Sequence, residues 1–211
     1  GLGRDNGRAL PGLAAATAVQ RLQNAGASQL ATVVMAEYAC GATGENPHFS
    51  RCINPLNAAA VVGGSSSGSA VAVASEIAYG ALGTDTAGSG RIPAATCGLL
   101  GLKTTHRQIS QEGVNPLAPS LDSVGLLARS AADAQQLWEA LLPGSRSRAS
   151  LLQPRLKAWL PETGLHDSIA TALVELADAC GTTQPVPYTP LRAHGTVLEL
   201  VCRLLLETTK T

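Results

Sequence analysis

Gly83-Thr84-Asp85-Thr86-Ala87-Gly88-Ser89-Gly90-Arg91-Ile92-Pro93-Ala94 is the most informative stretch of the chain, and a second stretch of small residues, Gly63-Gly64-Ser65-Ser66-Ser67-Gly68-Ser69, lies upstream of it. Glycine lets a backbone turn sharply and approach another group closely. Serine supplies a hydroxyl that a neighbouring base can activate for nucleophilic attack. Around both stretches, short apolar segments alternate with helix-forming segments, and this alternation predicts an α/β layer fold.

The periodicity of apolar residues and the positions of Gly and Pro predict the individual elements. We expect helices over 14–25, 69–79, 130–142, 167–179 and 195–206. We expect strands over 29–34, 81–84, 99–103 and 156–160, and a loop over 41–64. Ser130 followed by Asp133 is typical of a helix N-terminus. The Ser- and Arg-rich segment after Pro143 predicts a division of the chain into a core over 1–143, a linker over 144–155 and a further part of the same α/β domain over 156–211.

Composition argues against several classes of partner. The 211 residues contain 15 basic and 15 acidic side chains and only 3% aromatic residues. Nucleic-acid and membrane-surface proteins need a basic excess, and base stacking needs aromatic side chains. No apolar run reaches the roughly 18 residues that span a bilayer. We therefore expect no nucleic-acid partner and no membrane partner.

Cysteine and histidine usage predicts the compartment and the absence of a metal. The five cysteines are an odd number without a C-x-x-C pair, which indicates reduced thiols in a cytoplasmic protein. The four histidines are scattered, without the spacing of metal ligands. The prediction is a cytoplasmic protein with no metal, and a homodimer is left open as its assembly.

Two interpretations of the stretch 63–69 follow from its pattern alone. Its glycines have the spacing of a phosphate-binding P-loop, but Ser69 stands where that loop requires lysine. The stretch also contains G-x-S-x-G centred on Ser66, the pattern of a nucleophile elbow, with Asp122 and His166 following as acid and base. An elbow must lie between a strand and a helix, and the residues before it are poor strand formers.

A third interpretation is a resemblance carried by several motifs in one order. After the two stretches come C-G-x-x-G-x-K, then S-L-D-x-x-G and A-R-S, and upstream lie M-x-E-Y and N-P-H; these are residues 97–103, 120–125, 128–130, 35–38 and 46–48. Over about residues 10–142 the chain resembles the amidase signature family. The resemblance implies a mixed β-sheet flanked by helices on both faces, of which this chain would hold an incomplete part.

The resemblance also implies a catalytic mechanism without metal or organic cofactor. Ser89 matches the family's nucleophile, and Ser65 matches the bridging serine that follows a cis peptide bond after Gly64. The residues matching the oxyanion hole are Thr86, Ala87, Gly88 and Ser89. Gly64, Ser66, Asp85 and Arg91 would support the site, with Asp85 and Arg91 holding the turn. We expect the Ser65 hydroxyl within hydrogen-bond reach of Ser89.

Two departures from the family pattern bear on function. Ala87 stands where glycine is usual, which would strain a backbone with positive φ. No lysine precedes Lys103, whereas the family's catalytic lysine lies upstream of the bridging serine. The function implied is hydrolysis of a carboxamide C–N bond in a small-molecule substrate through a serine acyl-enzyme. The alternatives are an amidotransferase-type subunit of the same family and a catalytically inactive binding or scaffold protein.

Overall fold

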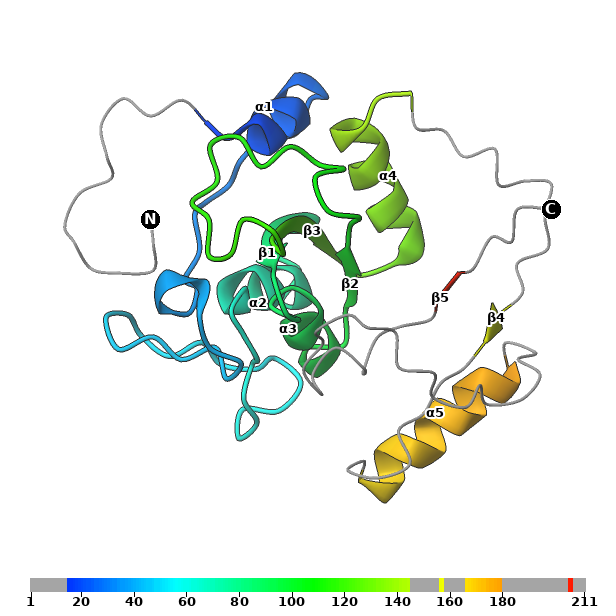
Figure 1. Ribbon diagram of the computed structural model, residues 1–211. Helices are drawn as coiled ribbons and strands as arrows, with labels where there is room; N and C mark the ends of the chain where they lie inside the picture. Colours follow the sequence, from blue (N-terminus) through cyan, green and yellow to red (C-terminus); the bar gives the residue numbers. More distant parts are fainter. Residues whose placement is uncertain (1–14, 145–155, 158–165, 180–204, 207–211) are drawn as a thin grey trace. The chain divides into compact units, whose positions relative to one another are not determined.

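The computed structural model describes residues 15–144, 156–157, 166–179 and 205–206 (Figure 1). The chain divides into two compact units, Gly1–Arg146 and Ser147–Thr211. Their boundary falls inside the segment 144–155 that the sequence predicts as a linker. Each unit is described by itself below.

A three-stranded antiparallel sheet forms the centre of the first unit. Its strands are β1 (Gly80–Asp85), β2 (Leu100–Lys103) and β3 (Ser123–Ala128), in the order β1-β3-β2. The central strand β3 is buried at every position. Asp85 pairs with Ser123 and Lys103 with Gly125, so the last residues of β1 and β2 lie at the same end of the sheet.

Helices cover both faces of this sheet (Figure 1). The alternation of β3 side chains explains why. Val124 and Leu126 belong to the core that also contains residues of α1 (Thr17–Asn24) and α4 (Ala131–Leu141), namely Ala18 and Leu141. Leu127 belongs to a second core with Ala70 of α2 (Ser67–Ala74) and Ala94 of α3 (Arg91–Thr96). The predicted α/β class with helices on both faces is therefore confirmed.

Local signals account for the ends of the helices. Ser130 caps α4, because its Oγ accepts a hydrogen bond from the Asp133 backbone N–H at 3.1 Å. The helix predicted over 69–79 begins and ends earlier than expected. Residue 76 has a positive φ of 60°, which is incompatible with a continuing right-handed helix. The predictions over 14–25 and 130–142 match α1 and α4.

The strand predicted over 29–34 is wrong. Leu30 and Val33 are 69% and 45% exposed, and the segment pairs with no strand in the described part of the chain. Its end instead lies along the serine-rich loop, defined as residues 63–66, and the first turn of α2 that follows. Gly68 N donates to Val34 O at 2.9 Å, and just beyond the segment Ala36 N donates to Ser65 O at 3.0 Å. Two isolated backbone bonds, one to the loop and one to the start of α2, replace the ladder that a strand would make.

The second unit contains α5 (Asp167–Ala179) and a short antiparallel pair of strands, β4 (Leu156–Lys157) and β5 (Leu205–Leu206). The helix predicted over 167–179 is confirmed. The helix predicted over 195–206 is wrong at 205–206, where β5 pairs with β4, and its remaining residues lie outside the described ones. The predicted strand over 156–160 is described only at its first two residues.

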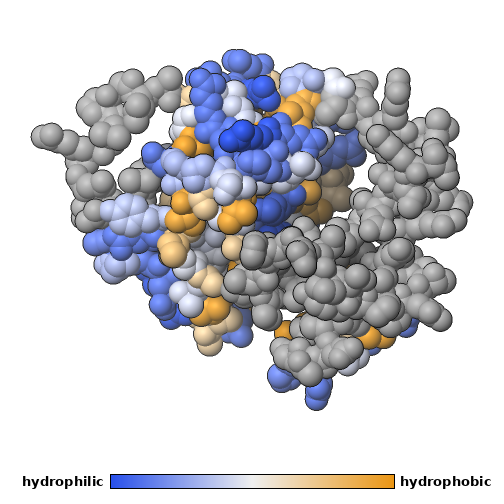
Figure 2. Space-filling view, viewed as in Figure 1, coloured by the Kyte–Doolittle hydropathy of each residue, from blue (hydrophilic) through white to orange (hydrophobic). Residues whose placement is uncertain are grey.

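The surface of the described residues is mixed in character. On the face seen in Figure 2, hydrophobic residues appear as separate spots among hydrophilic ones. No described helix combines the length and the apolar character needed to cross a membrane. The described residues also hold no group of three or more His, Cys, Asp or Glu side chains placed to bind a metal ion.

Candidate active site

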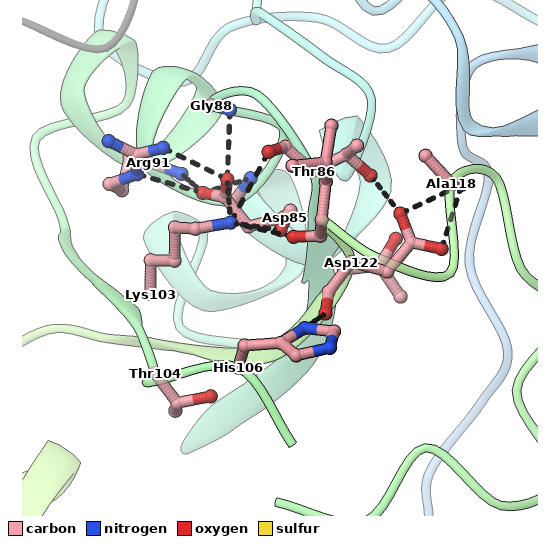
Figure 3. Close-up of polar contacts among 12 residues, drawn as sticks. Asp85, Thr86, Gly88, Arg91, Lys103, Thr104, His106, Ala118 and Asp122 are labelled. Atoms are coloured by element: carbon pink, nitrogen blue, oxygen red, sulfur yellow. Dashed lines mark hydrogen bonds and ion pairs between the residues drawn. The ribbon is translucent and has the colours of Figure 1, made fainter. Parts of the chain in front are cut away.

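The loop that connects β1 to α3, residues 86–90, carries Ser89 and is here called the nucleophile loop. The Asp85 carboxylate organises it (Figure 3). This carboxylate accepts hydrogen bonds from the backbone N–H groups of Gly88 at 2.8 Å, Gly90 at 3.1 Å and Arg91 at 3.1 Å. A single buried side chain at the end of β1 thus sets the course of the backbone through Ser89.

Arg91 forms a two-pronged ion pair with the same carboxylate. Its Nε donates to Asp85 Oδ2 at 3.0 Å and its Nη2 to Oδ1 at 3.1 Å. Asp85 is fully buried. Burial raises the pKa of the Asp85 carboxyl, but the hydrogen bonds and charge of Arg91, the charge of Lys103 and the Gly88 N–H outweigh it and lower the pKa to about 2. The carboxylate is therefore a charged anchor for the loop.

Lys103, at the end of β2, reaches the same region (Figure 3). Its Nζ donates to Asp85 O at 2.5 Å, Thr86 O at 3.3 Å and Leu121 O at 3.3 Å. It also lies 3.5 Å from Asp85 Oδ1. Sequence reasoning noticed Lys103 only as a lysine too far along the chain to be the family's base. In the structure its Nζ donates hydrogen bonds to three carbonyl oxygens. This agrees with the expectation that Lys103 is not the base that accepts the proton of the nucleophile.

Asp122 is a second buried carboxylate that the sequence did not assign to this site. Its Oδ1 accepts a hydrogen bond from Thr86 Oγ1 at 2.5 Å, and its carboxylate also accepts the backbone N–H groups of Leu117 and Ala118 at 2.8 to 3.1 Å. A cavity of about 220 Å³ adjoins these groups and is lined by Thr86, Val114, Leu117 and Asp122, among others. The S-L-D motif at residues 120–122 is the sequence signal that points to Asp122 as a residue holding Thr86.

The serine-rich loop lies directly against the nucleophile loop. The Gly64–Ser65 peptide bond is cis, as the resemblance predicts. Ser66 N donates to Ser89 O at 3.0 Å and links the two loops through their backbones. Any side chain at residue 64 would collide with the carbonyl oxygen of Gly41, so glycine is required for this close approach.

The predicted hydrogen bond between Ser65 and Ser89 is wrong. Ser65 Oγ is completely buried and has no hydrogen-bond partner among the described residues. The contact between the loops is made instead by the Ser66 N–H and the Ser89 carbonyl. Ser67 Oγ and Ser123 Oγ are also buried without a partner among the described residues, so this property does not single out Ser65.

The backbone at Ala87 shows no strain of the kind expected from its replacement of glycine. The positive φ in this loop falls on Gly88, at 125°, and Ala87 is not among the described residues with positive φ. Ala87 is exposed, whereas Ser89 is half-buried. Alanine therefore fits this position of the loop.

The nucleophile-elbow interpretation of Ser66 is wrong. No strand precedes Ser66 in the described segment 15–65; the first strand of the described residues is β1. Ser66 is buried and its Oγ donates to Thr84 O at 3.4 Å. The carboxylate of Asp122, its supposed acid, is held by Thr86, Leu117 and Ala118. The hydroxyl of Ser66 thus supports the end of β1.

Comparisons with known proteins agree with this geometry. The model of the amidase family matches residues 10–160. The chain belongs to the amidase family. It is 44% identical to Amidase 1 of Oryza sativa subsp. japonica over 133 residues, which cover 63% of this chain and 31% of that protein. It is 47% identical to one subunit of the glutamyl-tRNA(Gln) amidotransferase of Coxiella burnetii over 176 residues, which cover 75% of this chain and 36% of that subunit.

A solved amidase structure extends the comparison to three dimensions. It is 40% identical and superposes with a TM-score of 0.75, covering 82% of this chain and 40% of that one. The chain thus spans less than half the length of these members of the amidase family.

Proposed function

We propose that this amidase-family protein hydrolyses a carboxamide C–N bond through an acyl-enzyme on Ser89. The observation that carries the proposal is the nucleophile loop, whose backbone Asp85 fixes through three N–H groups while the serine-rich loop packs against it. Such preorganisation is the largest single source of catalysis in acyl transfer.

The reaction proceeds in two steps, acylation of Ser89 and hydrolysis of the acyl-enzyme. Ser89 Oγ attacks the amide carbonyl carbon while its proton passes through the Ser65 hydroxyl to a base. The C–N bond breaks, the amine leaves with a proton, and Ser89 carries the acyl group. Water then attacks the ester, which releases the carboxylic acid and restores the Ser89 hydroxyl. Ser65 Oγ is buried without a partner, as are Ser67 Oγ and Ser123 Oγ, so the family resemblance alone assigns Ser65 as the relay and a lysine as the base.

The proposed oxyanion donors are three of the four backbone N–H groups that the resemblance implies, without that of Gly88. The N–H of Gly88 already donates to Asp85 Oδ1. We therefore assign the oxyanion to the N–H groups of Thr86, Ala87 and Ser89. Of these three residues only Thr86 lines the cavity of about 220 Å³, so the cavity adjoins one end of the nucleophile loop.

The proposal needs no metal or organic cofactor, and we place the enzyme in the cytoplasm. An ammonia-transferring subunit is the second candidate, and the 47% identity to one subunit of a glutamyl-tRNA(Gln) amidotransferase is the observation that favours it. Both candidates use the same acyl-enzyme. They are distinguished by whether the amine released from glutamine is passed to a second acceptor.

Replacing Ser89 tests the proposal. In the full-length protein, Ser89→Ala should abolish amide and ester turnover, because removal of the nucleophile leaves no atom to carry the acyl group. A fluorophosphonate probe should label Ser89 in the wild-type protein, as read by peptide mass spectrometry. Ser66→Ala is the matched control and should retain labelling at Ser89. Labelling at Ser66 in the wild type would contradict the assignment.

A further inference from the structure

Lys103 binds the nucleophile loop through the carbonyl groups of two successive peptides. Its Nζ donates to Asp85 O at 2.5 Å and to Thr86 O at 3.3 Å. The Asp85 carbonyl shares a planar peptide group with the Thr86 N–H, and the Thr86 carbonyl shares one with the Ala87 N–H. In a trans peptide the C=O and N–H point in opposite directions, and the only cis bond among the described residues is Gly64–Ser65.

The N–H groups of Thr86 and Ala87, two candidate oxyanion donors, therefore point away from the Lys103 ammonium. Their directions are set because Lys103 binds the carbonyl group at the other side of each peptide, that of Asp85 and that of Thr86. A cation on the carbonyl side of a peptide also polarises it and strengthens its N–H as a donor. The side chain of Lys103 is only 25% exposed, so water screens this effect incompletely.

The charges around Asp85 balance one another. Both Arg91 and Lys103 face this one carboxylate, at 3.0 and 3.5 Å. Arg91 and Lys103 together exceed the charge of Asp85 by one, and the Asp122 carboxylate, which accepts a hydrogen bond from Thr86 Oγ1, offsets that excess. The effect of Lys103 on the oxyanion therefore comes from its direct bonds to the two carbonyls and not from the net charge of the cluster.

We propose that Lys103 is a positioning residue of this enzyme, which orients and polarises the Thr86 and Ala87 N–H groups toward the oxyanion. The inference rests on the proposed function, because it requires an oxyanion formed at Ser89. The contacts of the Lys103 ammonium are the carbonyl oxygens of Asp85, Thr86 and Leu121 and the Asp85 carboxylate. The effect of Lys103 reaches the reaction only through two peptide groups.

The test compares two inhibitors of the full-length protein. A trifluoromethyl ketone forms an anionic tetrahedral adduct with the serine, whereas a neutral carboxamide of the same acyl group binds without forming an oxyanion. Lys103→Met removes the charge and retains the chain length. We expect it to weaken the ketone about tenfold or more and to lower kcat in parallel, while the affinity of the carboxamide and KM stay nearly unchanged. Lys103→Arg should restore most of the ketone affinity.

Arg51→Met, which removes a positive charge at an exposed position of the first unit, is the control and should alter neither affinity. If Lys103→Met does not fold, as judged by circular dichroism, Lys103→Gln replaces it, because glutamine removes the charge but keeps a hydrogen-bond donor. Equal losses for both inhibitors, or no loss for either, in a folded variant would overturn the role of Lys103. No adduct and no labelling of Ser89 in the wild-type protein would instead overturn the proposed function.

Discussion

At the scale of single residues, Asp85 has the strongest electrostatic consequence. Its pKa falls from 3.8 to about 2 in the folded protein. As the pH falls below about 4, the unfolded chain takes up the proton first, so the stability that Asp85 contributes is present above this pH and is lost toward pH 2. The pKa difference corresponds to about 2 kcal/mol. Urea unfolding followed from about pH 5 to pH 2 should show this loss.

The variant Asp85→Asn separates the pH-dependent stability contributed by Asp85 from that contributed by the other carboxylates. The variant should lose about 3–5 kcal/mol near neutral pH, because it removes the carboxylate that faces the buried Arg91, and it should lose less stability on acidification than the wild type. Asp178→Asn, at an exposed position of α5, should keep the wild-type slope. Parallel curves for Asp85→Asn and the wild type below pH 4 would contradict the assignment.

The sequence predicts the residues of the site better than their contacts. Motif matching predicts the cis bond before Ser65 correctly, because it depends on a short stretch of chain, and the assignment of Ser89 as the nucleophile stays a prediction. The roles of Lys103 and Asp122 depend on long-range partners. Lys103 meets the carbonyls of β1 only because both outer strands pair with β3, and no local pattern contains that pairing.

At the scale of elements, the packing of α3 on β2 holds the helix that follows the nucleophile loop. A Cβ at Gly101 would lie 2.6 Å from Ala94 Cβ and 3.1 Å from Arg91 Cα. Gly101→Ala should therefore push the helix off the strand and destabilise the protein by about 1–3 kcal/mol, as measured by urea unfolding. Gly90→Ala is the matched control, because the nearest atom to its new Cβ would be 3.4 Å away. Equal stability of the two variants would contradict this packing.

The elements themselves were predictable where local signals agreed with tertiary packing. The helix α4 carries an N-cap serine and an apolar face, and it was predicted nearly to the residue. The segment 29–34 is apolar and β-branched, as a strand would be, yet it pairs with no described strand. Strand formation depends on partner strands, which a local sequence pattern cannot supply. The sequence predicts no strand at β3, since burial of this strand on both faces removes the alternation of apolar and polar residues that marks a strand.

At the scale of the whole molecule, the position of the base decides whether this chain can act alone. The sequence has no lysine before Lys103, and Lys103 is engaged with three carbonyl groups. The purified 211 residues should therefore hydrolyse no amide, as measured with a chromogenic anilide. Hydrolysis by the 211 residues that disappears on Lys103→Ala would show that Lys103 is the base.

The strand order β1-β3-β2 also governs when this site can assemble during protein synthesis. Both outer strands leave the ribosome before the strand that joins them, because β3 ends at Ala128. Until then, neither Asp85 nor Lys103 has the neighbour that brings them to one end of the sheet. Pairing between segments distant in sequence is slow because the intervening chain must first be ordered. The nascent chain thus exposes its apolar sheet residues until translation passes β3, and chaperones that shield such segments would act during this interval.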